Sequence, residues 1–138
     1  MVRLITKNKS QFALEFILII AFMLLLFLGF FTVISSRILE AKENENKQIA
    51  EGLANLVFDE VKLANSVADG YSRTFTLPKR VKGISYNISI LDNRELVANY
   101  LDNEYVIFLP DNVEGDVDIG LNEIDKTNDR IYIAPITT

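Results

Sequence analysis

The sequence predicts an α+β protein in which a long N-terminal hydrophobic α-helix is followed by a small antiparallel β-sheet head domain. Three observations support this class. The run from Phe16 to Ile34 holds 19 residues without a charge. The chain then continues to Val67 without a proline, with apolar residues at helical spacing. After Gly70 the pattern changes to the two-residue alternation that is typical of strands.

The apolar run has the length and composition of a membrane-crossing helix. At a rise of ~1.5 Å per residue it is about 28 Å long, close to the thickness of the hydrocarbon core of a bilayer. Thr32 is its only polar side chain, so it lacks the polar stripe of a helix in a soluble protein. We therefore expect residues 12–34 to lie in a membrane or in the core of an assembly.

The helix is expected to continue beyond the apolar run and to end near Val67. The polar stretch from Glu40 to Lys47 reads as solvated turns outside the membrane. After it, apolar residues recur at spacings of three or four: Ile49, Leu53, Leu56, Val57, Val61, Ala64 and Val67. Gly70 is a natural C-terminal stop. This predicts one helix over 11–67 and a head domain over 68–138.

The head domain is predicted to contain five or six short strands. They are Ser72–Leu77, Ile84–Ile90, Leu96–Tyr100, Tyr105–Leu109, a brief segment at Val117–Ile119, and Arg130–Ala134. Turns are expected at Asp92-Asn93 and Asp102-Asn103. Because Tyr105–Leu109 is apolar on both faces, it is predicted to lie centrally in one antiparallel sheet. The apolar face of that sheet is expected to cover the helical stripe.

Composition excludes several function classes. The chain has no cysteine and no histidine, so it lacks thiolate metal ligands and the commonest general base. Its net charge of −5 argues against nucleic-acid binding, which needs a basic face. No nucleophile–base pair, phosphate-binding glycine loop or carboxylate dyad is recognisable. We therefore expect neither catalysis nor a cofactor.

A single carboxylate, Glu15, stands at the N-terminal edge of the apolar run. A charge in an apolar segment is costly, by about 2.5–3.5 kcal/mol at the centre of a bilayer and less near its surface. In one interpretation Glu15 only marks the helix start, where an acid complements the helix dipole. In the other it awaits a positive partner. A cut before Gln11 would create such a partner, because it leaves an α-amino group four residues away.

The residues around this carboxylate carry a family resemblance. Lys7-Asn8-Lys9-Ser10 followed by Gln11-Phe12-Ala13-Leu14-Glu15-Phe16 resembles the class III signal peptide of archaeal type IV pilin-like proteins. That family has a basic leader, a small residue and a Q-x-x-x-E-F start that runs into a long apolar helix. One departure is Ser10, where the family more often has glycine. The resemblance covers about the first 35 residues.

The resemblance implies a processing step and a structural role. A prepilin-type peptidase would remove the basic leader, residues 1–10, by cutting between Ser10 and Gln11 on the cytoplasmic side. Gln11, Glu15 and Phe16 would then take part in subunit assembly. Loss of Arg3, Lys7 and Lys9 would leave 11 of the 14 basic residues against 19 acidic ones, so the net charge would change from −5 to −8.

The expected function is that of a pilin with a type IV pilin-like fold, in a surface filament built from copies of itself. The peptidase, the pilus assembly platform and its ATPase are the expected partners. Before assembly the chain would be a single-pass membrane protein with a cytoplasmic N-terminus. Three basic residues near each end of the apolar run do not settle that orientation, so it depends on the short N-terminal tail and on the resemblance.

Two alternatives belong to other classes. One is a pseudopilin or minor pilin of a secretion, adhesion or uptake machine. The other is a single-pass surface binding domain that never polymerises. Such an anchor needs neither the basic leader nor Glu15, and this disfavours the second alternative.

Two further sites are suggested in the head domain. Asn87-Ile88-Ser89 is an N-glycosylation sequon on the polar face of a predicted strand, so Asn87 is a candidate for glycosylation. The acid-rich stretch Asp111–Asp118 supplies oxygen ligands of the kind that bind Ca²⁺, but it does not match the twelve-residue calcium loop. We read it as an acidic surface loop and predict no metal site.

Overall fold

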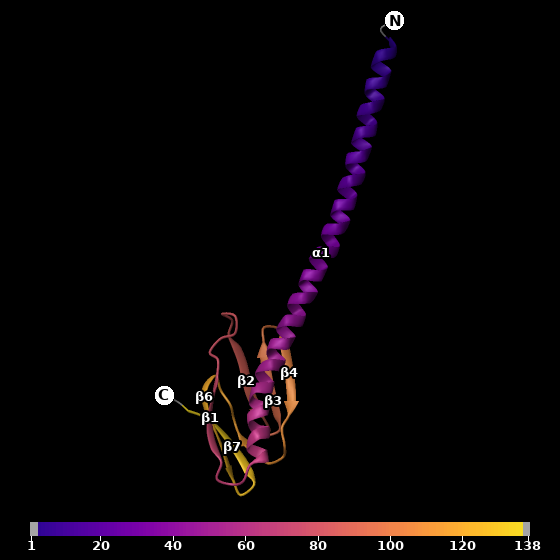
Figure 1. Ribbon diagram of the computed structural model, residues 1–138. Helices are drawn as coiled ribbons and strands as arrows, with labels where there is room; N and C mark the ends of the chain where they lie inside the picture. The colour runs from indigo at the N-terminus through magenta and orange to yellow at the C-terminus, as the bar shows by residue number, and fades with distance from the viewer. Residues whose placement is uncertain (1–2, 137–138) are drawn as a thin grey trace. The chain divides into compact units, whose positions relative to one another are not determined.

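A computed structural model describes the chain from residue 3 to residue 136, with side chains from Gln11 onward. Met1, Val2 and the side chains of the other predicted leader residues, including Ser10, lie outside the described part. One helix, α1 (Arg3–Ser66), precedes seven strands (Figure 1). This confirms the predicted α+β class and matches a pilin-like fold. The chain divides into two compact units, Met1–Lys42 and Glu43–Thr138, so the last turns of α1 belong to the head.

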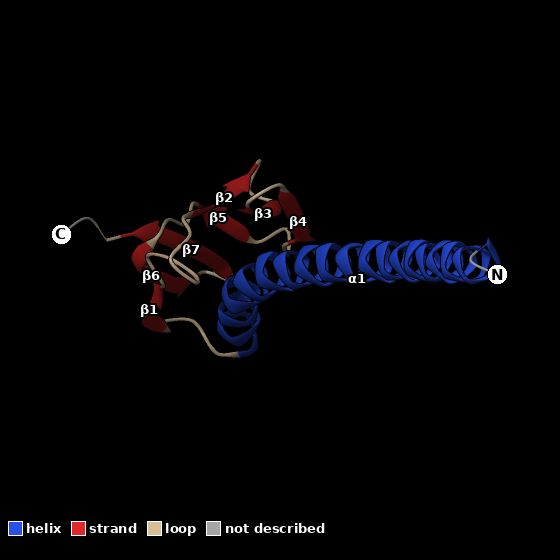
Figure 2. Cartoon of the chain, turned by 90° about the horizontal axis from the view of Figure 1, so that it is seen from above, coloured by secondary structure: helices blue, strands red, loops and turns tan. Residues whose placement is uncertain are grey.

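The helix agrees closely with its predicted C-terminal end. It ends at Ser66, one residue before the predicted Val67, and Gly70 follows with a φ of +90°. Its backbone begins at Arg3, so the predicted boundary at Gln11 falls inside a continuous helix. Figure 2 shows α1 in blue and the strands in red.

One face of the last turns of α1 forms part of the head core. Its fully or almost fully buried residues are Ala50, Leu53, Ala54, Val57, Val61 and Ala64. The predicted stripe was wrong at Leu56, which is 51% exposed. At 100° per residue Leu56 lies to the side of the face centred on Val57, so an apolar residue at acceptable spacing still points outward.

The strands form two sheets instead of the single sheet expected. The four-stranded sheet has the order β1 (Ser72–Leu77), β6 (Gly120–Thr127), β7 (Arg130–Pro135) and β5 (Val113–Gly115), and β5 pairs parallel to β7. The three-stranded antiparallel sheet consists of β2 (Tyr86–Leu91), β3 (Glu95–Tyr100) and β4 (Asn103–Phe108). Short turns fix the pairing within β2–β3–β4, whereas β1 finds its partner, β6, far along the chain.

The inward faces of both sheets complete the core with α1. On β2 the predicted alternation is confirmed, because Tyr86, Ile88 and Ile90 are buried. Ile84, the first residue of the predicted strand, instead forms an isolated bridge with Val81. Burial raises the pKa of Tyr86, and the carboxylate of Asp118 adds to the rise. The Tyr86 hydroxyl donates to the carbonyl of Pro78 at 2.6 Å and holds the β1–β2 loop against the sheet.

Three predictions for the later strands are wrong. The segment predicted to be central forms β4, which lies at the edge of the three-stranded sheet. Val117–Ile119 is not a strand, and β5 and β6 lie on either side of it. The second turn is formed by Leu101-Asp102, one residue earlier than expected, with a φ of +53° at Leu101.

Strand β6 escaped prediction because two of its inward residues are polar. Asn122 is fully buried, and Lys126 is 6% exposed. The Asn122 amide group donates to the carbonyls of Asp118 and Gly120, and its oxygen accepts from the N–H of Asp118. These hydrogen bonds offset the desolvation of a buried amide. Polar residues at buried positions conceal the apolar alternation that identifies a strand.

Lys126 joins β6 to the end of the helix. Its Nζ donates to the carbonyl of Val67 at 2.8 Å and to that of Asn65 at 3.2 Å. Carbonyls at a helix C-terminus lack partners within the helix and attract a positive charge. The ammonium group therefore caps α1, and it also pairs with Asp129 at 3.5 Å.

Replacing Lys126 by methionine is expected to lower the free energy of unfolding by about 1.5–3 kcal/mol, the usual contribution of hydrogen bonds to a charged group. Methionine keeps most of the buried stem, so the loss reports mainly the cap. All five tyrosines follow Gly70, so near-UV circular dichroism of the full chain in detergent reports on the head. Lys62→Met, at an exposed lysine of α1, is the control and should change stability by less than about 0.5 kcal/mol. Equal effects of the two substitutions would contradict a capping role.

Candidate assembly site

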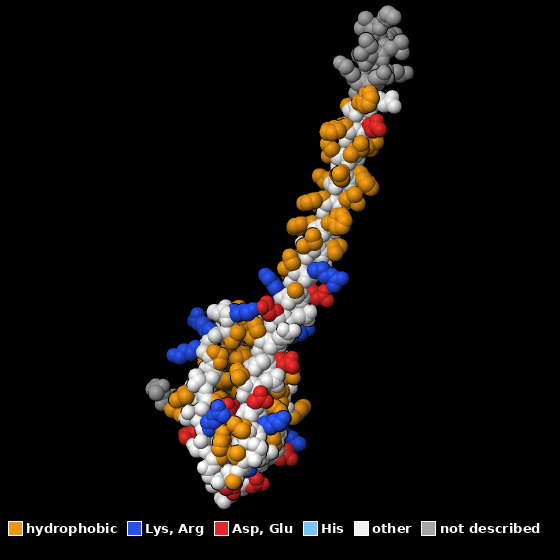
Figure 3. All heavy atoms as spheres, viewed as in Figure 1, with side chains coloured by type: hydrophobic (Ala, Val, Ile, Leu, Met, Phe, Trp, Pro, Cys, Tyr) orange, Lys and Arg blue, Asp and Glu red, His pale blue; other side chains and the backbone are white. Residues whose placement is uncertain are grey.

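The N-terminal unit presents an uncovered apolar helix. Every side chain from Gln11 to Ile34 is exposed, and the most apolar part has a mean hydropathy of 3.1. Figure 3 shows hydrophobic side chains on successive turns of this segment, one acidic side chain near its start, and further charged groups where it approaches the head. The helix is long and apolar enough to cross a membrane. None of the described residues buries it, so its apolar surface needs lipid or other protein.

Two of the three hydroxyl side chains at the far end of this segment and just beyond it bond to the helix itself. Thr32 Oγ1 donates to the carbonyl of Leu28 at 2.9 Å, and Ser36 Oγ donates to that of Val33 at 2.9 Å. Such bonds to the preceding turn let hydroxyls enter an apolar environment at low cost. Glu15 has no comparable local partner among the described side chains.

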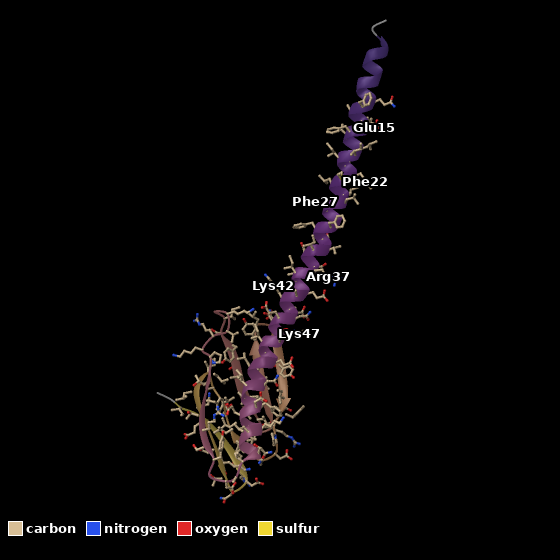
Figure 4. All side chains as sticks on the ribbon, in the orientation of Figure 1. Glu15, Phe22, Phe27, Arg37, Lys42 and Lys47 are labelled. Carbon is tan, nitrogen blue, oxygen red and sulfur yellow. The ribbon has the colours of Figure 1, made fainter. Side chains whose placement is uncertain are left out.

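Glu15 lies on one face of α1 with three apolar side chains. Phe12, Phe16 and Ile19 surround it at helical spacing, and all three are more than half exposed. Figure 4 shows Glu15 near the start of the described side chains, with Phe22 and Phe27 farther along the same segment. A partner helix packed on this face would exclude water from the carboxylate and raise the cost of leaving it unpaired.

Gln11 lies one turn before Glu15, a separation that places two side chains on the same face about 5–6 Å apart at Cβ. Because α1 begins at Arg3, the main-chain N–H of Gln11 is inside the helix in the uncut chain. Cleavage between Ser10 and Gln11 would create a new helix N-terminus, with free N–H groups, a positive dipole end and an amine. All three features favour a carboxylate close by.

A polar collar follows the apolar segment. Arg37 pairs with Glu40 at 3.5 Å, and Lys47 pairs with Glu43 at 3.2 Å, all largely exposed. Figure 4 labels the two basic residues. Within the head unit, Lys82 forms an ion pair with Glu45. Exposed pairs contribute little to stability, about 0–1 kcal/mol each. These pairs lie where the run of apolar side chains has ended.

Asn87 is accessible for modification. Its side chain is exposed on β2, an edge strand, and lies opposite Asn99 of β3. Ser89, the third residue of the sequon, is half-buried on the same face. The alternation predicted for this strand therefore places the acceptor asparagine outward.

Each carboxylate of the acidic stretch Asp111–Asp118 has a partner within the head. Asp116 Oδ1 accepts hydrogen bonds from the N–H groups of Ile90 and Val117, both at 2.8 Å. Asp118 accepts from the N–H of Ile119. Glu114 pairs with Arg130, and Asp111 pairs with Arg94 at 3.3 Å, so all four carboxylates of the stretch have partners within the head. Within residues 3–136, no group of three or more acidic side chains is arranged to hold a metal ion.

Comparisons with protein-family models, with curated proteins and with solved structures find no match to this chain.

Proposed function

We propose that this chain is a pilin, the structural subunit of an archaeal type IV pilus-like surface filament. In this proposal the leader is removed before Gln11, the subunit waits in the membrane, and its apolar helix then moves into the filament core. The observation that supports it most is the contrast within α1. Its last turns are buried by the head, whereas residues 11–34 are apolar and uncovered.

Helix packing supplies the energy of assembly. Apolar area removed from water is worth ~25 cal/mol per Å². Moving from lipid to protein gains less, because lipid already covers the helix, so the gain depends on close side-chain packing and on polar pairs. Glu15 is the one charged group inside this surface, and its pairing with the Gln11 amine would make packing specific.

The proposed role implies several binding partners and two locations. Copies of the chain are its main partner, and the prepilin-type peptidase, assembly platform and ATPase act before polymerisation. The chain is then a membrane protein before assembly and part of an extracellular, glycosylated filament with an adhesive role afterwards. Catalysis has no part in this function.

The competing functions use the same apolar helix but differ in whether, and in how many copies, the chain enters a filament. A minor pilin or pseudopilin would be processed at Gln11 and appear in few copies. A non-polymerising surface domain would stay in the membrane. The leader and Glu15 favour a pilin, minor pilin or pseudopilin over a non-polymerising surface domain, since an anchor that never assembles has no use for a carboxylate in its apolar face.

The mature subunit is expected to begin at Gln11. Electron microscopy of the sheared surface fraction, with mass spectrometry of its subunits, tests this directly. The expected result is filaments composed mainly of this chain, with Gln11 as the first residue and a glycan mass on the peptide that contains Asn87. Met1 retained in surface filaments would contradict processing, and filaments that lack the chain would contradict the pilin role.

A further inference from the structure

Strand β4 leaves one edge of the three-stranded sheet open. Its partner on one side is β3, and the order β2-β3-β4 leaves the other side without a strand (Figure 1). Tyr100 pairs with Asn103 across the two-residue turn. This register fixes the direction of every main-chain group along β4.

In an antiparallel hairpin with a two-residue turn, the pair next to the turn exchanges both hydrogen bonds, and bonded pairs then alternate. Asn103, Tyr105 and Ile107 therefore bond to β3. The N–H of Leu109 donates to the carbonyl of Arg94 at 2.7 Å, so this alternation of bonded residues continues two residues beyond Ile107. It follows that the main-chain groups of residues 104, 106 and 108 point away from the sheet. No described residue is positioned as a strand beside them.

The opposite edge of this sheet, formed by β2, is partly covered. On β2 the outward N–H of Ile90 donates to Asp116 Oδ1, which covers that edge in part. The exposed Asn87 adds the candidate glycan there. Natural edge strands are usually blunted by lysine, proline, bulges or a covering segment. Strand β4 has no lysine and no proline, and Glu104 is its only charged residue.

The side chains of β4 are apolar on both faces. Val106 is 38% exposed and Phe108 is 67% exposed on the outer face. Tyr105 and Ile107 pack against the core on the inner face but remain partly exposed. A strand added beside β4 would satisfy the outward main-chain groups and cover apolar side chains on both faces at once. The occupant must therefore be an extended, largely apolar segment.

We propose that β4 pairs antiparallel with β4 of a second copy, which joins two three-stranded sheets into one continuous sheet across a two-fold axis at Val106. In this register Val106 faces itself and Glu104 lies opposite Phe108 of the other copy, so no like charges meet. Parallel pairing in register would place Glu104 beside Glu104, which is unfavourable. Each copy supplies the matching apolar edge, and this identifies the occupant as the chain itself.

The two-fold symmetry of this contact indicates which subunits it joins. A two-fold contact uses the same patch on both partners, whereas neighbours along a helical filament use different patches. The β4 contact therefore links subunits of two filaments, and this part of the inference rests on the proposed function. One such contact is small beside the ~1,200–2,000 Å² of a stable interface. Repetition along two filaments multiplies it, so filaments associate into bundles.

Bundling of purified filaments tests the contact. Val106→Lys places a charge at the two-fold axis, and Val106→Pro removes an N–H that faces away from β3, a position where edge strands tolerate proline. Both variants are expected to form filaments, with the bundled fraction lowered about tenfold or more through the loss of a multivalent contact. Leu63→Lys, at a residue of α1 that is 39% exposed, is the matched control and should bundle like the wild type. Bundling of Val106→Lys at the wild-type level, or wild-type filaments that stay single, would overturn the proposal.

A cross-linking measurement needs no filaments. Opposed residues of a hydrogen-bonded antiparallel pair have Cα atoms about 5.5 Å apart, within the range that a disulfide spans. The chain has no cysteine, so Val106→Cys introduces a unique thiol. The concentrated full chain in detergent is expected to form disulfide dimers about tenfold more than Leu63→Cys, because only the first thiol lies at the axis. Equal dimer formation would overturn the β4 contact. Absence of wild-type filaments would instead contradict the proposed function.

Discussion

Replacing Glu15 by alanine is expected to lower the amount of subunit in the sheared filament fraction by about tenfold or more, while processed subunit in the membrane stays near the wild-type level. In packed helices that exclude water, the Gln11 amine would lose the carboxylate that neutralises it. Breaking a buried pair by removing one partner costs about 3–5 kcal/mol, and 1.4 kcal/mol is already tenfold in an equilibrium. Insertion should persist, because an apolar segment without a charge enters lipid more easily.

Two further variants separate charge pairing from other effects. Glu15→Gln should recover part of the assembly, since its amide still accepts a hydrogen bond from the amine. Glu40→Ala removes a carboxylate from the same helix, but this one is exposed beyond the apolar segment and paired with Arg37. It should leave assembly almost unchanged. Filaments at the wild-type yield for Glu15→Ala would show that Glu15 only marks the start of the helix.

Gly115→Ala is expected to lower the free energy of unfolding of the head by about 3 kcal/mol or more. Gly115 has a φ of +108°, a conformation that costs a side chain on the order of 1–3 kcal/mol. A Cβ there would also lie 2.0 Å from the carbonyl oxygen of Ile133, where β5 pairs with β7. Because the obstacle is main chain in a strand, it cannot be relieved by a rotamer change. The measurement is thermal or chemical unfolding of the full chain in detergent, followed by the tyrosine signal of the head.

Gly120→Ala is the control that isolates the clash. Gly120 has a φ of +105°, almost the same conformation, but no atom lies within 4 Å of an added Cβ. It should show only the conformational cost and be clearly the milder change. If the two substitutions destabilise the head equally, the close approach of Gly115 to Ile133 makes no separate contribution.

Local patterns predicted a large part of the fold. The uninterrupted run of nineteen almost entirely apolar residues predicted a helix, because a stretch of that length and composition is typical of a membrane-spanning helix. The alternation in Ile84–Ile90 predicted most of β2 and its buried face, although the strand itself spans Tyr86–Leu91. The turn predicted at Asp92-Asn93 is present, with φ values of +52° and +53°. The candidate assembly residues Gln11, Glu15 and Phe16 came instead from the resemblance of residues 7–16 to the class III signal peptide of archaeal type IV pilin-like proteins. Their exposure on one uncovered helix agrees with an assembly role without testing it.

Contacts between distant segments decided the rest. Strand β6 is a strand although Asn122 and Lys126 are polar, because the acceptors for Lys126 are carbonyls at the end of α1, about sixty residues earlier. The apolar composition of β4 suggested a central strand, yet β4 lies at an edge because no described strand pairs with it on the side away from β3. The need for glycine at Gly115 arises from the parallel pairing with β7. Periodicity along the chain determines what each segment becomes, whereas strand order, polar burial and open edges depend on partners that no local pattern specifies.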